Sequence, residues 1–409
     1  MRSKGLGKVS SKGLSHVYKI VLMKRVAYSF ASGLSQNYIS IYITKLGASI
    51  VQLGSLNTIS SLISSFLALP LGWLADYYSL KKIYLSSLAL TLLTPLIYFL
   101  ARDWRITVIP ILISHIEMWS ISLLETIIIA ETLPNRRRAT GFGLLYMLSG
   151  LASIVSPTIA GLILSYLGGL NVRSIKILFF IQFLLILCTY TWVVLGLRKE
   201  TIHSLDIKLV RDPINELRLV LRNSKIRGWL IVESLGGFIF GAVNPFIMVY
   251  AAEIKGADAL ILGLMGSISN LTYMFSSFPI GRLADIIGRR KTIALFRPFL
   301  YASMLLLILA PNKNYLLLVA ALRGIAWGAM SAWSSLRMEL VESSFRGIWS
   351  GIIGMLRGLA RAPASLIGGL LWTLVSPSAP FVMLVVVDSI VRLPLVLSMP
   401  ETLNENEKR

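Results

Sequence analysis

The stretch GRLADIIGRRK at residues 281–291 lies between two long apolar segments and decides the fold. A degenerate copy of it, GWLADYYSLKK, occupies residues 72–82. A shift of 209 residues superposes the two copies, and the same shift places Leu53-Gly54 on Leu262-Gly263. The chain therefore repeats itself as two similar halves.

A shift of 208 residues extends this repeat into the later part of each half. The matched pairs are His115 with Arg323, Trp119 with Trp327, Gly143 with Gly351, and Gly161 with Gly369. Repeated bundles of this kind suit a protein that rocks one half against the other around a site near the middle of the membrane.

The composition identifies the solvent as mainly lipid. Hydrophobic residues make up 55% of the chain and charged residues only 14%, which is too little polar material to cover a water-soluble globule. Apolar runs of about 20 residues, enough to cross the hydrocarbon core, recur along the chain. We expect spans at residues 26–46, 50–75, 83–101, 106–131, 140–168, 174–197, 228–252, 258–284, 292–311, 315–340, 348–375 and 379–399. The predicted fold is an all-α integral membrane protein with twelve transmembrane helices in two pseudo-symmetric six-helix bundles.

The net charge of +21 is distributed unevenly between the predicted loops. With the amino terminus inside the cell, 26 basic residues fall in inner segments and 7 in outer loops, as the positive-inside rule requires. We therefore predict a multi-pass protein of the cell membrane with both termini cytoplasmic. The basic residues should attract anionic lipid heads, and nucleic acid is not an expected partner.

The same pattern divides the chain into five parts. We expect a basic cytoplasmic tail at residues 1–25, a first bundle at 26–197, a cytoplasmic linker at 198–227, a second bundle at 228–399 and a cytoplasmic tail at 400–409. Residues 1–25 show no cleavable signal peptide.

The stretch at residues 281–291 closely resembles the loop signature of the major facilitator superfamily. This resemblance implies alternating access and a cytoplasmic gate that holds the two bundles together. The gate residues it indicates are Gly72, Asp76 and Lys82 in the first half, and Gly281, Asp285, Gly288, Arg289, Arg290 and Lys291 in the second. The first copy departs from the pattern at Ser79 and Leu80, where the family has Gly and Arg.

Chemistry explains why a gate needs these residue types. Glycine permits a tight turn close to a neighbouring helix. Asp285 is expected to accept hydrogen bonds from the free N–H groups at that helix's amino end. The arginines should bind lipid phosphates and nearby acids such as Glu131 and Glu339. The family also commonly ends each half with a Pro-Glu-Thr-like stretch, and Pro400-Glu401-Thr402 occupies that place.

Charged residues inside the predicted spans are functional candidates, because each costs at least a few kcal/mol unless it is paired or faces water. The arginines are Arg282, Arg297, Arg323, Arg337, Arg357, Arg361 and Arg392, and the acids are Glu117, Glu125, Glu233 and Asp388. Asp388 and Arg392 lie one helical turn apart and are expected to neutralise each other. Arg282 and Arg337 should extend to the membrane surface.

The candidate substrate site combines six residues. Arg357 and Arg361 share one face of a helix and lack an acid there, so they could bind Glu117, Glu125 or an anionic group of the solute. His115, Trp119, Arg323 and Trp327 occupy like faces of repeat-related helices and are predicted to line the same pocket. Glu117 and Glu125 are the candidates for proton coupling. The alternative for these two acids is a static salt bridge to an arginine of the other half.

The resulting hypothesis is a secondary transporter that moves a small solute by alternating access, coupled to protons. Export of a drug or metabolite is the first interpretation, and proton-coupled carriage of a small organic anion is the alternative. A non-transporting membrane sensor or receptor is the alternative of another class. An enzyme is not expected, because a Walker loop and metal-spaced His or Cys clusters are absent. We expect a monomer without cofactor or metal, whose partners are the solute, protons and lipids.

Overall fold

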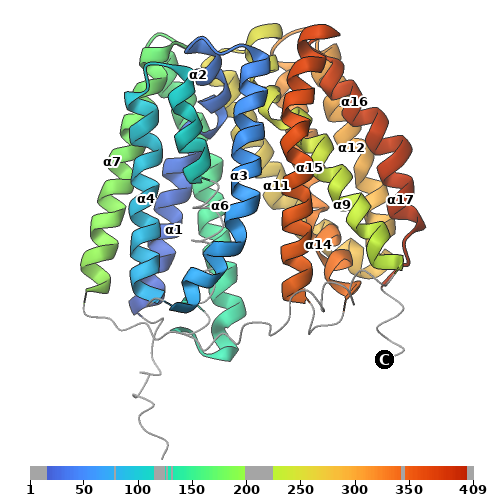
Figure 1. The fold of residues 1–409 in the computed structure, drawn as a ribbon, viewed down its shortest axis with the longest axis horizontal. Helices are drawn as coiled ribbons and strands as arrows, with labels where there is room; N and C mark the ends of the chain where they lie inside the picture. The colour runs from blue at the N-terminus through green and yellow to red at the C-terminus, as the bar shows by residue number, and fades with distance from the viewer. Residues whose placement is uncertain are drawn as a thin grey trace, which may run out of the picture.

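The computed structural model describes residues 16–402, apart from residues 78–79, 115–124, 126–127, 130–131, 199–223 and 342–345. All regular structure in that part of the chain is helical, as predicted, and the helices form two groups that stand side by side (Figure 1). The tail before residue 16 and most of the predicted linker lie outside the described residues.

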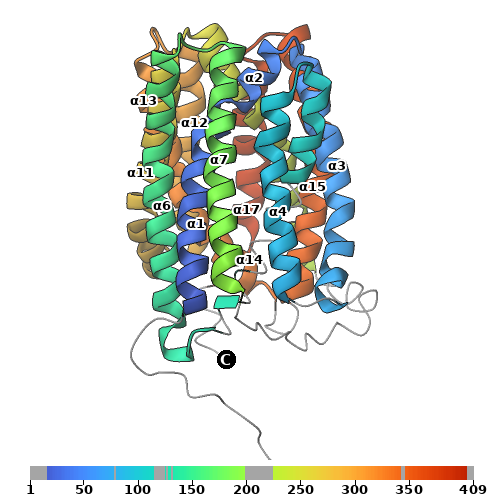
Figure 2. The same cartoon turned by 90° about the vertical axis from the view of Figure 1, so that its left-hand side faces the viewer.

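The first half contains helices from His16 to Leu197. Its elements are α1 (His16–Ser35), η1 (Gln36–Tyr38), α2 (Ile39–Lys45), α3 (Ile50–Tyr77), α4 (Leu80–Leu100), η2 (Trp104–Thr107), α6 (Asn135–Tyr166) and α7 (Val172–Leu197). Figure 2 shows α1 between α6 and α7, and α1 packs against both.

The second half follows the same plan. Its elements are α9 (Ser224–Val243), η3 (Asn244–Phe246), α10 (Ile247–Val249), η4 (Tyr250–Ile254), α11 (Ala259–Ile287), α12 (Arg289–Leu309), α13 (Tyr315–Gly328), α14 (Met330–Glu339), α15 (Arg346–Leu374), α16 (Ala379–Val387), η6 (Asp388–Arg392) and α17 (Leu393–Ser398).

Eight helices of the described residues are long and apolar enough to cross a membrane. Helices α1 and α15 are not among them, and these two carry the basic residues Lys24, Arg25, Arg357 and Arg361. The first helix also begins earlier than the predicted residue 26. Lys24, which we expected in the tail, is only 2% exposed, because Glu125 neutralises its charge inside the bundle.

The first helix of each half is interrupted at an equivalent position. The 3₁₀ turn η1 separates α1 from α2, and η3 separates α9 from α10. The two turns are related by the 208-residue shift of the repeat, and Pro245 lies at the start of the second. Interrupted helices expose backbone and polar side chains where a solute site is needed.

Glycines allow the two halves to approach each other at four helix contacts. A Cβ atom on Gly54 of α3 would lie 2.4 Å from the Ser365 oxygen of α15, and one on Gly263 of α11 would lie 2.4 Å from the Pro157 oxygen of α6. Gly161 and Gly369 make the corresponding contacts with Ala259 and Ile50, at 2.8 and 3.0 Å. These glycines are the repeat-related pairs of the sequence, and they permit close helix packing.

Hydrogen bonds join the halves at the end of the molecule that holds α2, which we call the α2 end. The Tyr38 hydroxyl donates to the Ala259 oxygen (2.9 Å), and the Asn37 amide donates to the Leu262 oxygen (3.2 Å). Figure 1 shows α3 and α15 next to each other at the α2 end and well separated at the opposite end. That opposite end holds Gly288, and we call it the motif end.

The glycine contacts generate a first prediction. Replacing Gly263→Ala puts a methyl group against the Pro157 oxygen, so α6 and α11 must separate. We expect a loss of about 1–3 kcal/mol, typical of overpacking, seen as a lower melting temperature of the purified protein. Gly351→Ala is the matched control, because, apart from its chain neighbours and the backbone of its own helix, no described atom lies within 4 Å of the added methyl. A melting temperature of Gly263→Ala equal to that of the control would show that the contact tolerates a side chain.

Candidate solute cavity and motif loop

A cavity of about 720 Å³ lies between the two halves. The turn η1 contributes Gln36 and Asn37 to its wall, and α10 contributes Ile247 and Met248. The interrupted helices therefore both reach the cavity. Further polar groups in the wall are Tyr28, Tyr98, Ser153, Gln182, Ser269 and Asn270.

The charged groups of the cavity wall are all arginines. Arg25 comes from α1, Arg323 from α13 and Arg361 from α15, and the described lining contains no aspartate or glutamate. Arg25 hydrogen-bonds Glu125 behind the wall (3.1 Å). Among the described residues, no hydrogen bond or ion pair neutralises Arg323 or Arg361. The cavity is thus large and electropositive.

The structure separates the predicted substrate residues into three sets. Arg323 and Arg361 line the cavity, as predicted. Trp327 and Arg357 instead line a smaller pocket within the second half. His115 and Trp119 lie outside the described residues, as does Glu117.

Arg357 has a different partner from the expected ones. Its Nε atom lies 3.5 Å from Glu233 of α9, so Glu125 does not pair with it. The reason is that α9 and α15 pack along each other within one half, whereas Glu125 lies in the other. Arg337, expected at the membrane surface, also points to Glu233, at 3.9 Å.

Glu125 is held within the first half. Its carboxylate accepts hydrogen bonds from Lys24 (2.6 Å) and Arg25 (3.1 Å), and the side chain is 3% exposed. The prediction of a static salt bridge between Glu125 and an arginine of the other half is therefore wrong, because Glu125 pairs with Lys24 and Arg25 of α1. The amides of the cavity were also missed, although Asn and Gln inside apolar spans were a readable signal.

The predicted Asp388–Arg392 pair is confirmed, with a distance of 3.2 Å. Arg297 of α12 also binds Asp388 through two nitrogens, and Tyr301 donates a hydrogen bond to it (2.8 Å). Arg297 lies on another helix, so sequence spacing gave no sign of this contact. The buried carboxylate joins α12 to η6, which is a π-helical turn.

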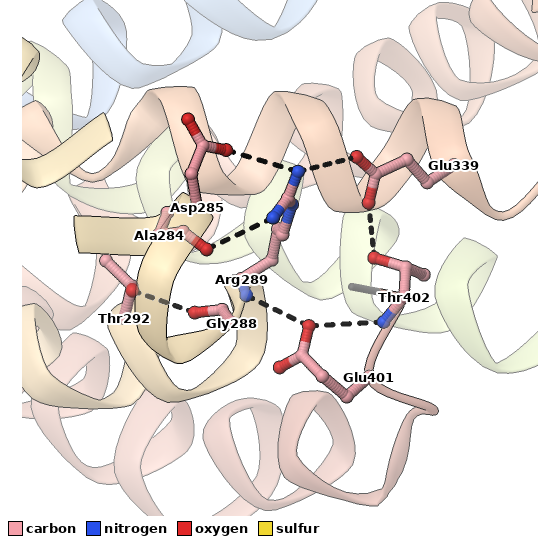
Figure 3. Close-up of polar contacts among 8 residues, drawn as sticks. All are labelled: Ala284, Asp285, Gly288, Arg289, Thr292, Glu339, Glu401 and Thr402. Atoms are coloured by element: carbon pink, nitrogen blue, oxygen red, sulfur yellow. Dashed lines mark hydrogen bonds and ion pairs between the residues drawn. The ribbon is translucent and has the colours of Figure 1, made fainter. Parts of the chain in front are cut away.

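Gly288 forms the turn between α11 and α12 (Figure 3). Its φ angle of +102° is a conformation that favours glycine. The Glu401 carboxylate accepts hydrogen bonds from the backbone N–H groups of Arg289 (2.9 Å) and Arg290 (3.1 Å). A Cβ atom on Gly288 would lie 2.5 Å from Glu401. This position therefore requires glycine for two reasons: the backbone has a positive φ angle, and Glu401 leaves no space for a Cβ atom.

Arg289 links this turn to α14. Its guanidinium contacts Glu339 (3.1 Å), as predicted, and Asp285 (3.2 Å), and it donates to the Ala284 oxygen (3.2 Å). Thr402 donates to the other oxygen of Glu339. The last described residues of the chain are thus bound into the motif loop.

Glu401, and not Asp285, caps the start of α12, while the gate role of Asp285 between the two halves stays a prediction. Asp285 is 71% exposed and pairs with Arg289 in its own half, so it does not bind the start of another helix. It lies in the last turn of α11, one turn before Arg289, whereas Glu401 faces the first N–H groups of α12. Lys82 and Lys291 are exposed, and a Cβ atom on Gly281 would lie 3.4 Å from the Ser331 hydroxyl of α14. The side chain of Asp76 lies outside the described residues, and Gly72 is part of α3.

The sequence profile of the Major Facilitator Superfamily matches residues 25–362 and 237–405. This chain belongs to that superfamily. An uncharacterised MFS-type transporter of Methanocaldococcus jannaschii is 25% identical over 350 residues, which are 83% of this chain and 84% of the relative. The protein is therefore a multi-pass membrane transporter of a small solute and not an enzyme.

Solved structures agree on the fold. The nucleoside transporter NupG superposes with a TM-score of 0.77 at 15% identity, covering 94% of this chain and 99% of that one. A bacterial homolog of the human lysosomal transporter Spinster gives a TM-score of 0.70 at 13% identity, covering 95% and 92%. The likeness confirms the twelve-helix fold predicted from the sequence.

The motif loop provides a second prediction. Glu401→Ala removes the acceptor of two backbone N–H groups and a negative charge at a helix start. We expect a loss of stability of about 1–2 kcal/mol. Asp285→Ala removes an exposed ion pair and should cost only a few tenths of a kcal/mol. The melting temperatures of the two variants test this difference. A larger loss for Asp285→Ala than for Glu401→Ala would show that Asp285 stabilises the motif loop more than Glu401 does.

Proposed function

We propose that this transporter carries a small hydrophilic organic anion by alternating access between its two halves. The observation that supports this is the pair of cavity arginines, Arg323 and Arg361, without a described acid in the cavity wall. Guanidinium groups stay charged and are costly to bury without a counter-charge. An anionic solute would supply that charge, and arginine binds carboxylates through two parallel hydrogen bonds.

The rest of the wall indicates the kind of anion. The wall contains four side-chain amides, those of Gln36, Asn37, Gln182 and Asn270. An amide can donate a hydrogen bond to a hydroxyl or carbonyl oxygen and can accept one from a hydroxyl group. The volume of about 720 Å³ is within the usual range for a small-molecule site. A carboxylate bearing several hydroxyl or carbonyl groups fits this combination.

Export of amphipathic compounds is the second candidate. One relative, the multidrug resistance protein fnx1 of Schizosaccharomyces pombe, is 25% identical over 158 residues, or 36% of this chain. A lipophilic cation would meet three arginines in the cavity wall, however, and electrostatic repulsion disfavours that solute. The cavity therefore supports the anion carrier over the exporter.

We assign the motif end to the cytoplasm, with both termini there and the protein in the cell membrane. The distribution of basic residues supports this orientation. The halves are joined at the α2 end and separated at the motif end, so the structure then corresponds to an inward-facing state. The bacterial Spinster homolog was solved in an inward-facing, unoccupied conformation, which supports this reading.

Glu125 remains our candidate for proton coupling. Arg25 lines the cavity and also binds the Glu125 carboxylate. A solute anion bound to Arg25 would compete with Glu125 for the same guanidinium. Among the described residues, the acid would then keep Lys24 as its ion-pair partner, and loss of a neighbouring positive charge favours the protonated form of a carboxylate. Solute binding and protonation are thereby linked through one arginine.

The solute site can be tested by thermal stability of the purified protein with hydroxylated organic anions, lipophilic cations and neutral polyols. Binding to the folded state raises stability by about 2.7 kcal/mol at a hundredfold excess over the Kd. We expect an anion to stabilise the wild type, and Arg323→Gln or Arg361→Gln to weaken its apparent affinity about 10- to 100-fold. Arg282→Gln, an exposed arginine of α11 outside the cavity, should behave like the wild type. Equal stabilisation of all variants by a lipophilic cation would favour the exporter.

Coupling is tested in liposomes with the anion identified in this way. An inward proton gradient should drive accumulation by the wild type, whereas Glu125→Gln should lose accumulation but retain exchange of labelled for unlabelled solute. Retained exchange also demonstrates that the variant is folded. Gradient-driven accumulation by Glu125→Gln at the wild-type level would exclude Glu125 as the coupling acid.

A further inference from the structure

A second pocket, of about 40 Å³, lies inside the second half and away from the central cavity. Its wall combines basic and aromatic side chains from α9, α12, α13, α14, α15 and η6. The residues that matter here are Glu233, Arg297, Trp333, Arg337, Arg357 and Arg392. It is the smaller of the two pockets, and the solute site described above does not use it.

The charges around this pocket do not balance. Four arginines meet two acids, Glu233 in the wall and Asp388 behind it, among the residues that the structure describes. Arginine remains protonated in proteins. Two positive charges are therefore left over in a largely buried place.

Each acid meets two of the arginines, so one positive charge is left over on each side of the pocket. Arg297 and Arg392 both hydrogen-bond Asp388, and their guanidinium groups stack at 5.4 and 4.4 Å from the Trp333 ring. Arg392 also donates to the Val232 oxygen (2.9 Å). These two arginines are well provided with partners.

Arg337 and Arg357 have poorer hydrogen-bond partners than Arg297 and Arg392. Their contacts with Glu233, at 3.9 and 3.5 Å, are too long for good hydrogen bonds. The Nε atom of Arg337 is buried without a hydrogen-bond partner in the described part of the chain. The Arg337 and Arg357 side chains are 22% and 32% exposed, so they are partly buried, and a ligand that accepts hydrogen bonds from both arginines would be favoured.

The size of the pocket limits that ligand. A volume of about 40 Å³ exceeds the roughly 10–15 Å³ that a cavity needs to hold one water molecule, and it is far below that of the central cavity. It admits a monatomic or similarly small anion but excludes a solute large enough to fill the central cavity. Aromatic walls of low polarity strengthen the attraction between such an ion and the arginines.

We propose that this pocket binds a small inorganic anion of chloride size, held between Arg337 of α14 and Arg357 of α15. The ion supplies the negative charge that Glu233 alone does not provide. It joins α9, α14 and α15 on the side of the second half that faces the motif end. Because Arg357 lies one helical turn from Arg361, the ion is also placed to hold α15 in register beside the solute cavity.

The test uses the purified full-length protein in a gluconate buffer free of halide. Chloride and bromide are titrated, and the melting temperature is followed. We expect a saturable rise in the wild type and an apparent affinity at least about tenfold weaker in Arg337→Gln. Arg282→Gln is the matched control and should respond as the wild type does. A bromide-soaked crystal should show anomalous signal between Arg337 and Arg357, which tests the wild type even where Arg337→Gln folds poorly.

Three results would overturn the proposal: a melting temperature that does not respond to halide, an equal response in Arg337→Gln, or bromide signal elsewhere but not in this pocket. The experiment is independent of the solute proposal. Arg323→Gln should lose the response to organic anions while keeping the response to halide. Loss of both responses in Arg323→Gln would mean that the halide occupies the central cavity instead.

Discussion

The architecture depends on the close approach of backbone to backbone at four glycines between the halves. Lipid offers helices no hydrophobic gain on association, so packing contacts and hydrogen bonds must join them. Gly54, Gly161, Gly263 and Gly369 provide this contact at symmetric positions. The contact lies toward the α2 end, and the halves are separated at the motif end (Figure 1).

The polar chemistry is divided unequally between the halves. The first half neutralises its intramembrane acid, Glu125, with two basic groups. The second half contains more arginines than the described acids can neutralise, and it presents them to two separate cavities. Burial of arginine without a protein partner is tolerated where function supplies a counter-charge. This asymmetry, laid on a symmetric fold, is the basis of both anion proposals.

Much of the fold was readable from the sequence. Hydropathy and the repeat predicted the helical bundles, and the Asp388–Arg392 pair followed from helical spacing. Partners on different helices could not be predicted in this way. Arg357 meets Glu233, and Glu401 meets the start of α12, because of packing between helices distant in sequence. Of the cavity arginines, Arg361 was a candidate because no acid lies beside it on its own helix, and Arg323 because the repeat matches it with His115.

The capping of α12 also has a consequence for biosynthesis. Arg289, at the start of that helix, is made 112 residues before Glu401, the carboxylate that binds it. During translation the turn at Gly288 is therefore made before the carboxylate that caps it. A chain truncated before Glu401 would therefore lack the carboxylate that accepts from the first N–H groups of α12.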